Sequence, residues 1–449
     1  MSEQTIAAVS TPFGCGGVAM VRVSGERAIE ICDKVFSKNL FEIESNRAVH
    51  GEIFHSGDII DDGIIVIYRA PHSYTGEDTV EIMCHGGILL TQLVLESVID
   101  SGAEFAEAGE FTQRAFLNGK LGLIGVESVI DVINAESREK LKLAKSTSTL
   151  SKKIVELYDE LKILLSSIYV YIDYPDEDLE DVPKKSLLER LYRLIEDLNL
   201  LMQTYRTGRA INEGILTVIC GKPNTGKSSL LNRLVGADKA IVTEIPGTTR
   251  DIIEETISAG KILLRLCDTA GIRKTDDTVE IIGVNRALKR VDEAELVLIV
   301  FDISEELDSD DFELIKKING NVIAVLNKSD LPAKIDIEYI KNTFPNTVTI
   351  SAVNGEGIME LLQTIEKMYA DGEINYNETA ILRNLRQYTS VKSAFDAVSE
   401  AVISLETGYT QDVVGLDLEI AMAKLGEIDG RAVSEDIVHE IFSRFCVGK

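Results

Sequence analysis

Between residues 221 and 228 the chain reads Gly221-Lys222-Pro223-Asn224-Thr225-Gly226-Lys227-Ser228. This stretch matches GxxxxGK[ST] in full, and it lies between an apolar run at 215–220 and a helical run at 229–234, the context that the motif requires. Backbone N–H groups of such a loop surround phosphate oxygens, and the helix start adds positive potential. We expect Lys227 to neutralise the β- and γ-phosphates and Ser228 to bind Mg²⁺. The stretch therefore predicts a doubly wound α/β domain that binds a nucleotide.

Two later motifs, at ordered spacing, indicate which base is bound. Asp268-Thr269-Ala270-Gly271 follows an apolar strand at 262–266 and places Asp268 on the metal side, with the N–H of Gly271 toward the γ-phosphate. Asn327-Lys328-Ser329-Asp330 follows the strand 322–326 and matches NKxD, in which a carboxylate accepts two N–H bonds from guanine. Adenine lacks that donor pair, so Asp330 predicts guanine specificity. Ser351-Ala352 ends a sixth strand and resembles the last GTPase motif, which backs the base.

The stretch Pro246-Gly247-Thr248-Thr249 lies between the phosphate loop and the second motif, where the first switch segment of a GTPase belongs. Thr249 is the candidate for the second side-chain ligand of Mg²⁺, beside Ser228 and Asp268. Arg250 and Asp251 can equally belong to an ordinary surface turn. The residues expected around the nucleotide are Asn224, Thr225, Gly226, Lys227, Ser228, Ser229, Thr243, Glu244, Ile245, Pro246, Gly247, Thr248, Thr249, Asp268, Thr269, Ala270, Gly271, Asn327, Lys328, Asp330, Ser351 and Ala352.

The position after the second motif holds Ile272, where many small GTPases carry a water-orienting glutamine. An isoleucine cannot polarise water, and no arginine is obviously offered as an internal finger. Hydrolysis of GTP therefore requires another positive charge and another water-orienting group.

Length and composition restrict the class of protein. At 449 residues the chain is too long for one core, and 45% hydrophobic with 27% charged residues is typical of soluble globular domains. No apolar run reaches membrane-spanning length, and residues 1–9 lack an export signal, so we expect a cytoplasmic protein without a membrane partner. The net charge of −28 disfavours a general nucleic-acid coat. Six cysteines without paired spacing favour reduced thiols over disulfides or zinc.

Changes in composition divide the chain into four segments. Residues 1–118 read as mixed α and β, with strands expected at 18–23, 49–54, 64–68 and 80–84 and helices at 27–35 and 89–100. Residues 119–211 and 374–449 have helical composition and enclose the nucleotide domain at 212–373. We therefore predict a multidomain α+β and α/β protein, in which a doubly wound α/β domain is inserted into a helical domain whose halves pair.

Several motifs carry a resemblance to a known family. The elements Pro223 to Asn232, Ile245 to Asp251 and Asp268 to Arg273 resemble the Era-like branch of translation GTPases. The remaining motifs are similar to the MnmE (TrmE) family of bacterial and organellar tRNA wobble-uridine modification GTPases, over essentially the whole chain. These are Ser73-Tyr74-Thr75-Gly76-Glu77-Asp78, His85-Gly86-Gly87, Gly109-Glu110-Phe111-Thr112, Arg114 to Lys120 and Phe445-Cys446-Val447-Gly448-Lys449.

The resemblance implies a potassium-activated GTPase whose G domains dimerise across the nucleotide, with K⁺ in the place of an arginine finger. By motif position, Asn224 is the side-chain ligand of K⁺, and Thr243, Ile245 and Thr248 match the loop that completes its shell. Lys227 and Glu280 are the implied catalytic residues, Glu280 as the group that orients the attacking water. From its surroundings alone, Glu280 reads as a solvated acid.

The resemblance also implies an N-terminal domain that binds tetrahydrofolate and forms a constitutive homodimer. Arg22, Glu81 and Lys120 match its folate-contacting positions, and the terminal Lys449 approaches the same site. A carboxylate can pair with the N–C–N edge of a pterin, but Arg22 can equally be an edge-strand charge and Lys120 a helix-end cation. A lone cysteine such as Cys446 is more often structural than catalytic.

In such a system a FAD-dependent MnmG-type partner forms a heterotetramer with the GTPase. Together they install an aminomethyl or carboxymethylaminomethyl group on carbon 5 of the wobble uridine of tRNA, with the carbon from 5,10-methylene-tetrahydrofolate or a 5-formyl analogue.

Two alternatives stay open at this point. A ribosome-assembly GTPase of the Era-like branch would carry a basic RNA module after the G domain, but residues 376–449 read as helical and acidic, with no GXXG loop. A dynamin-like or septin-like assembly GTPase would lack the folate-like motifs.

Overall fold

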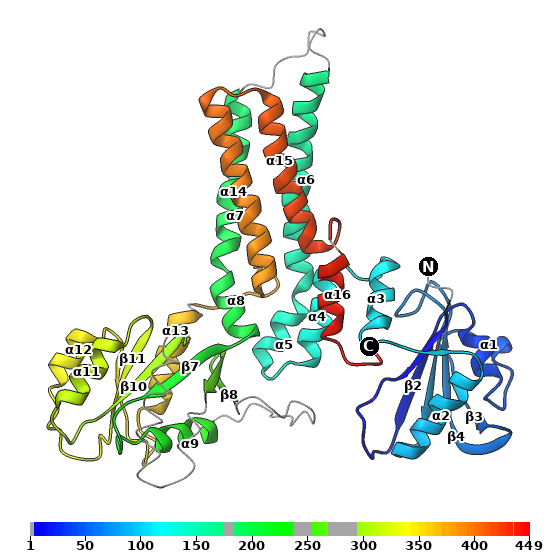
Figure 1. The fold of residues 1–449 in the computed structure, drawn as a ribbon, viewed down its shortest axis with the longest axis horizontal. Helices are drawn as coiled ribbons and strands as arrows, with labels where there is room; N and C mark the ends of the chain where they lie inside the picture. The colour runs from blue at the N-terminus through cyan, green and yellow to red at the C-terminus, as the bar shows by residue number, and fades with distance from the viewer. Residues whose placement is uncertain (1–3, 174–183, 238–253, 268–293, 371, 434) are drawn as a thin grey trace. The chain divides into compact units, whose positions relative to one another are not determined.

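The computed structural model describes residues 4–173, 184–237, 254–267, 294–370, 372–433 and 435–449 (Figure 1). The chain divides into two compact units, one of Met1–Ile130 with Gly426–Lys449 and one of Asp131–Leu425. The smaller unit therefore joins the two ends of the chain. The four segment boundaries drawn from the sequence stay predictions.

The smaller unit contains a six-stranded sheet in the order β3-β4-β5-β2-β1-β6. Neighbouring strands are antiparallel except β1 and β6, which run parallel. Apolar residues of the strands alternate with polar ones and meet α1 and α2 in one core cluster. The strands are β1 Ile6–Val9, β2 Ala19–Ser24, β3 Ala48–His55, β4 Asp58–Tyr68, β5 Thr79–Cys84 and β6 Glu104–Phe105. The helices are α1 Ala28–Asp33, η1 Leu40–Glu42, α2 Ile88–Asp100 and α3 Glu110–Leu117.

The C-terminal residues of the chain pack onto this unit. Helix α16, Glu435–Ser443, lies against α3. Phe442 in its last turn and Phe445 just beyond it form a cluster with Leu123 and Val126 of α4, Leu123–Ile133. Beyond the helix, Val447 forms an isolated β-bridge with Ala108. The terminal motif is therefore held by backbone pairing as well as by apolar contacts.

The larger unit contains a bundle of long helices, in which α6, α7, α14 and α15 lie side by side (Figure 1). The heptad-like spacing of Ile154, Leu157, Leu161 and Leu164 buries one face of α6, as the sequence predicts. Two shorter helices, α5 and α8, contact each other. The helices are α5 Arg138–Lys145, α6 Thr147–Asp173, α7 Lys184–Gln203, α8 Tyr205–Asn212, α14 Leu385–Thr407 and α15 Gln411–Asp429.

A second six-stranded sheet, inserted between α8 and α14, has the order β12-β11-β10-β7-β9-β8. All neighbours are parallel except β8 and β9, and two apolar clusters contribute its core. The strands are β7 Ile215–Cys220, β8 Glu254–Ala259, β9 Ile262–Cys267, β10 Leu296–Asp302, β11 Val322–Asn327 and β12 Thr347–Thr349. The helices are α9 Lys227–Ala237, α11 Ser309–Lys317, α12 Ile337–Thr343 and α13 Ile358–Tyr369.

The fold class predicted from the sequence is confirmed: an α+β unit, a helical bundle and an inserted doubly wound α/β sheet. Each strand expected in the first segment is present, and the expected helices are α1 and α2. Strand β12 ends at Thr349, two residues before Ser351, because the chain turns there into a tight loop. None of the helices in the described part of the chain combines the length and the apolar character that crossing a membrane requires.

Candidate functional site

The phosphate loop, residues 221–228, connects β7 to α9 and has the backbone that its glycines permit. Gly221 has φ +147° and Gly226 has φ +91°, and a Cβ at Gly226 would lie 2.1 Å from Nδ2 of Asn327. Only glycine fits such an approach. The hydroxyl of the buried Thr225 donates to the carbonyl of Lys222 at 2.9 Å, and the ammonium of Lys227 donates to the same carbonyl. The loop and the lysine predicted to bind phosphate therefore lie together.

The guanine motif is hydrogen-bonded directly to the phosphate loop. Asn327 is buried at the end of β11, and its Nδ2 donates to the carbonyl of Thr225 at 2.8 Å. Its Oδ1 accepts the N–H of Ala352 at 3.0 Å. The hydroxyl of the buried Ser351 donates to Oδ1 of Asp330 at 2.6 Å. Residues of three motifs, from Thr225 to Ala352, are thus joined into one hydrogen-bonded frame.

Lys328 adopts a left-handed backbone, with φ +66°, and its ammonium pairs with the carboxylate of Asp302 at the end of β10. Burial raises the pKa of Asp302, but hydrogen bonds from Lys328 and Ser304 outweigh it, so the pKa lies below its usual value. The ionised Asp302 pairs with the ammonium of Lys328 and so helps to fix this residue of the base motif. Sequence reasoning missed Asp302, although it is a carboxylate at the carboxyl end of a central strand, where ligands of α/β sheets gather.

Lys222 also has partners that the sequence did not reveal. Its ammonium pairs with Asp308 at 2.8 Å and with Asp311 at 2.7 Å. Asp308 and Asp311 form the capping box of α11. Burial lowers the pKa of Lys222, and hydrogen bonds from the two carboxylates raise it by more, so the net pKa lies above its usual value. This pair fixes the start of the phosphate loop to the neighbouring helix.

Part of the predicted site lies outside the described residues. This applies to the first switch segment, the second motif and the predicted water-orienting glutamate. The residues concerned are Thr243, Glu244, Ile245, Pro246, Gly247, Thr248, Thr249, Asp268, Thr269, Ala270, Gly271, Ile272 and Glu280.

The folate-like motif residues of the smaller unit form a second cluster. Nε and Nη2 of Arg22 donate to Oε1 of Glu81 at 3.0 and 2.8 Å, across the register of β2 and β5. Nη1 of Arg22 donates to the carbonyl of Gly448 at 3.5 Å, and the hydroxyl of Ser10 donates to that carbonyl at 3.0 Å. The chain end is thereby attached to the Arg22–Glu81 pair, which is 12–13% exposed.

Aromatic rings surround this pair. The guanidinium of Arg22 lies 5.5 Å from the ring centre of Tyr74 and 5.7 Å from that of Phe111. The hydroxyl of Tyr68 donates to Oε2 of Glu81 at 3.3 Å; burial, followed by the charge of Glu81, raises the pKa of Tyr68. The sequence did not single out these three aromatic residues as site residues, because aromatic side chains in strands and helices are most often core.

The other two predicted folate residues have different surroundings. Lys120 is exposed, and its ammonium donates to the carbonyl of Pro71 at 2.8 Å, on the loop that also carries Tyr74. Lys449 is the last residue and follows the anchored Gly448. The geometry therefore brings Arg22, Glu81 and the chain end together, and the ammonium of Lys120 binds the loop that carries Tyr74.

Comparisons with known proteins cover the whole chain. The family model described as the MnmE helical domain matches residues 123–446, and the one described as the GTP-binding protein TrmE N-terminus matches residues 5–120. A protein of Thermoanaerobacter pseudethanolicus named tRNA modification GTPase MnmE is 42% identical over 460 residues, covering 100% of both chains. The chain belongs to the MnmE family. A namesake from Clostridioides difficile is 40% identical over 458 residues, covering 100% of this chain and 99% of its own.

Solved structures similar to parts of this family member include a variant of Era from Aquifex aeolicus bound to GDP.AlF4⁻. It is 28% identical, covers 41% of this chain and 66% of its own, and gives a TM-score of 0.28. The G domain of the iron transporter FeoB from T. maritima is 26% identical, covers 34% of this chain and 97% of its own, and gives a TM-score of 0.26.

Proposed function

We propose that the chain is a GTP hydrolase that acts in the modification of tRNA, as the relatives with full-length similarity are named. One observation carries the nucleotide part: the buried Asn327 joins the phosphate loop to the base-backing residue Ala352, beside Asp330. Mg²⁺ fits this site, since Ser228 lies in the first turn of α9 at the phosphate loop and hydroxyl oxygen is a suitable ligand. Thr249 and Asp268 are its further proposed ligands.

Hydrolysis in this proposal depends on K⁺. Asn224 is exposed at the tip of the phosphate loop and has a left-handed backbone, with φ +63°, so its side chain is available to a ligand outside the loop. Thr243, Ile245 and Thr248 would complete the shell of the ion, and Glu280 would orient water in place of the glutamine that Ile272 replaces. A monovalent cation there supplies the charge of an arginine finger.

The test is GTP turnover of the full chain in KCl against NaCl at equal ionic strength. Turnover should be much higher in KCl, and Asn224→Ala should abolish the difference while GDP binding persists. Equal wild-type rates in both salts would remove K⁺ from the proposal. Glu280→Ala should lower turnover by about 10²–10⁴ at unchanged nucleotide affinity, because it removes general-base assistance. Asp276→Ala and Asp277→Ala are its matched controls and should have much smaller effects.

The smaller unit is the proposed site of tetrahydrofolate, which would supply the one-carbon unit. Glu81 offers a carboxylate to the N–C–N edge of a pterin, Arg22 orients that carboxylate through two hydrogen bonds, and Lys120 and Lys449 suit the glutamate tail. Titration with 5-formyl-tetrahydrofolate should give saturable binding that Glu81→Gln weakens by at least about tenfold, since a charge-assisted pair is lost. A leucine in place of the exposed Ile59 is the control. Unchanged binding by Glu81→Gln would exclude this site.

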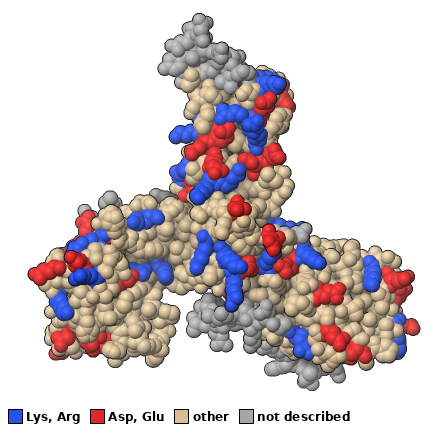
Figure 2. Space-filling view, turned by 180° about the vertical axis from the view of Figure 1, so that it is seen from behind, with Lys and Arg blue, Asp and Glu red and all other residues tan. Residues whose placement is uncertain are grey.

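The remaining parts of the proposal concern assembly. We place this chain as a homodimer in a heterotetramer with a FAD-dependent MnmG-type partner, which together modify carbon 5 of the tRNA wobble uridine. Lys and Arg are interspersed with Asp and Glu over the visible face of the helical bundle (Figure 2). Since the net charge is −28, a partner that contributes basic surface to the tRNA contact is consistent with this distribution.

A further inference from the structure

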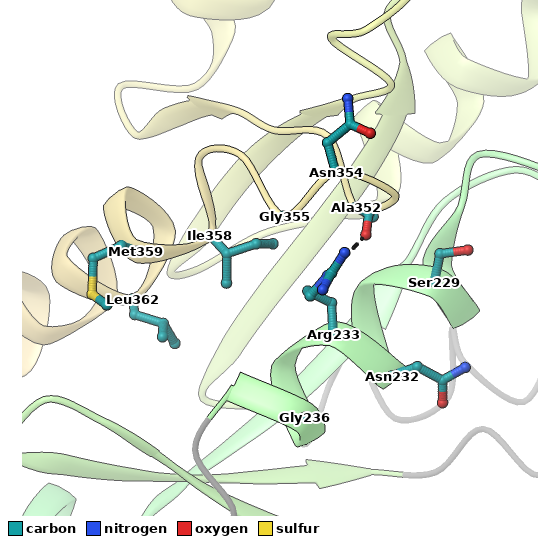
Figure 3. Close-up of a pocket in the computed structure, with 10 residues that line it drawn as sticks. All are labelled: Ser229, Asn232, Arg233, Gly236, Ala352, Asn354, Gly355, Ile358, Met359 and Leu362. Carbon is teal, nitrogen blue, oxygen red and sulfur yellow. Dashed lines mark hydrogen bonds between the residues drawn. The ribbon is translucent and has the colours of Figure 1, made fainter.

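Arg233 lies on α9, five residues after Ser228, and reaches the loop that follows β12. Its Nε donates to the carbonyl of Ala352 at 3.2 Å, and its Nη2 donates to the carbonyl of Val353. Figure 3 shows the guanidinium directed from α9 toward Ala352, at one side of a pocket whose other wall is formed by Ile358 and Leu362. One planar group thus binds two consecutive carbonyls, a geometry that lysine cannot reproduce.

The loop at 351–355 is shaped to receive this guanidinium. Gly355 donates its N–H to the carbonyl of Ser351 at 2.7 Å, and it has φ +83°, in the left-handed region. A Cβ at Gly355 would lie 3.4 Å from Cζ of Arg233, at the limit of ordinary van der Waals contact. Glycine is therefore favoured here by the left-handed turn, and the turn lies directly against the guanidinium.

The two bonds of Arg233 complete a closed ring of contacts. Thr225 of the phosphate loop accepts from Asn327, Asn327 accepts the N–H of Ala352, and the carbonyl of Ala352 accepts from Arg233. Helix α9 then leads from Arg233 back to the phosphate loop. The peptide groups of Ala352 are thus held from both sides, from β11 through Asn327 and from α9 through Arg233. The neighbouring Ser351 directs the carboxylate of Asp330.

We propose that Arg233 is a positioning residue for guanine: it fixes the base-backing loop, residues 351–355, relative to the phosphate loop, so that base and phosphates are bound as one unit. This inference rests on the proposed guanine-nucleotide function. In this proposal Arg233 acts on the nucleotide through Ala352, whose carbonyl it binds. Loss of the guanidinium frees the loop, which must then be ordered again at each binding event, and that ordering lowers affinity.

The test measures binding of fluorescent GDP to the full chain. Arg233→Met keeps the unbranched stem that lines the pocket and removes the fork. We expect about tenfold weaker binding, mostly through faster dissociation, since two partly exposed charge-assisted bonds are lost. Arg233→Lys should recover part of the affinity, because an ammonium can still reach one carbonyl. The control Lys317→Met removes one positive charge at the far end of α11 and should change affinity by less than about twofold.

A phosphate-only probe separates positioning from general stability. Competition by pyrophosphate should be the same for wild type and Arg233→Met, because the phosphate loop itself is unchanged. The inference would be overturned if Arg233→Met weakened the binding of GDP and of pyrophosphate equally, or did not weaken the binding of GDP. It would also be overturned if Lys317→Met weakened GDP binding as much as Arg233→Met does. If the wild type does not prefer GDP over ADP, both the positioning role of Arg233 and the proposed guanine-nucleotide function are wrong. Intact wild-type preference with an unaffected Arg233→Met overturns the positioning role alone.

Discussion

Replacing Asp330 by asparagine reverses the polarity of the group that should bind guanine. In the structure, Oδ1 of Asp330 accepts the hydroxyl of the buried Ser351 at 2.6 Å. The amide oxygen of an asparagine can accept the same bond, which directs the NH₂ group to the position of the second carboxylate oxygen. Two N–H donors of guanine would then face a donor. Xanthine carries a carbonyl at that position of its ring and can accept from the amide.

The magnitude follows from the charge of the lost group. Hydrogen bonds to a charged partner are worth about 1.5–3 kcal/mol, which corresponds to about 10- to 150-fold in affinity. Asp330 is exposed, so water competes for its oxygens and the lower part of that range applies. We therefore expect GDP to bind about 10- to 30-fold more weakly, and xanthosine diphosphate to bind more tightly than to the wild type.

The assay is competition of GDP, xanthosine diphosphate and ADP against fluorescent GDP on the full chain. Ser351→Ala serves as a companion, because it removes the orienting bond and leaves the charge of Asp330 in place. Ser351→Ala should weaken GDP binding by a smaller factor than Asp330→Asn does, and it should not strengthen the binding of xanthosine diphosphate. If Asp330→Asn leaves the ratio of GDP to xanthosine diphosphate affinities unchanged, Asp330 does not bind the base and the guanine assignment is wrong.

Three further outcomes follow from the geometry. Gly448→Ala would place a Cβ 2.2 Å from the last carbonyl of β1 at φ +95°, so the chain end should detach and titration should show weaker folate binding with the fold retained. Gly208→Ala would place a Cβ 2.0 Å from the carbonyl of Leu382. The free energy of unfolding, measured in urea, should therefore fall by about 1–3 kcal/mol. The hydrogen bond from His85 to Asp61, followed by the charge of Asp61, raises the pKa of His85, so Asp61→Asn should lower that pKa in an NMR titration. Because the folded pKa is raised, this pair stabilises the fold below the usual histidine pKa of about 6.5 and ceases to do so as pH rises through the folded value.

The local conformation of the nucleotide motifs can be predicted from the sequence, because each motif is a short strand followed by a loop of fixed backbone. The glycines Gly221 and Gly226 and the hydroxyls of the phosphate loop act within a few residues of one another, so their spacing alone predicts the conformation. The long helices are likewise encoded by apolar periodicity, as in α6. The strands β2 to β5 are recognisable from alternation, and the fold class follows from the order of these elements.

Other features exist only through contacts between distant segments. Arg22 meets Glu81 because the antiparallel register of β2 and β5 sets them opposite each other, and a shift of one residue would turn one side chain to the other face. The chain end reaches Ser10 across 438 residues of sequence because α16 buries its aromatic residues against α3 and α4. Exposed arginines are common at helix surfaces, so Arg233 carries no sequence signal of its own. Its two carbonyl partners are decided by where the tertiary structure places the loop at 351–355, since hydrogen-bond geometry depends on distance in space and not on distance along the chain.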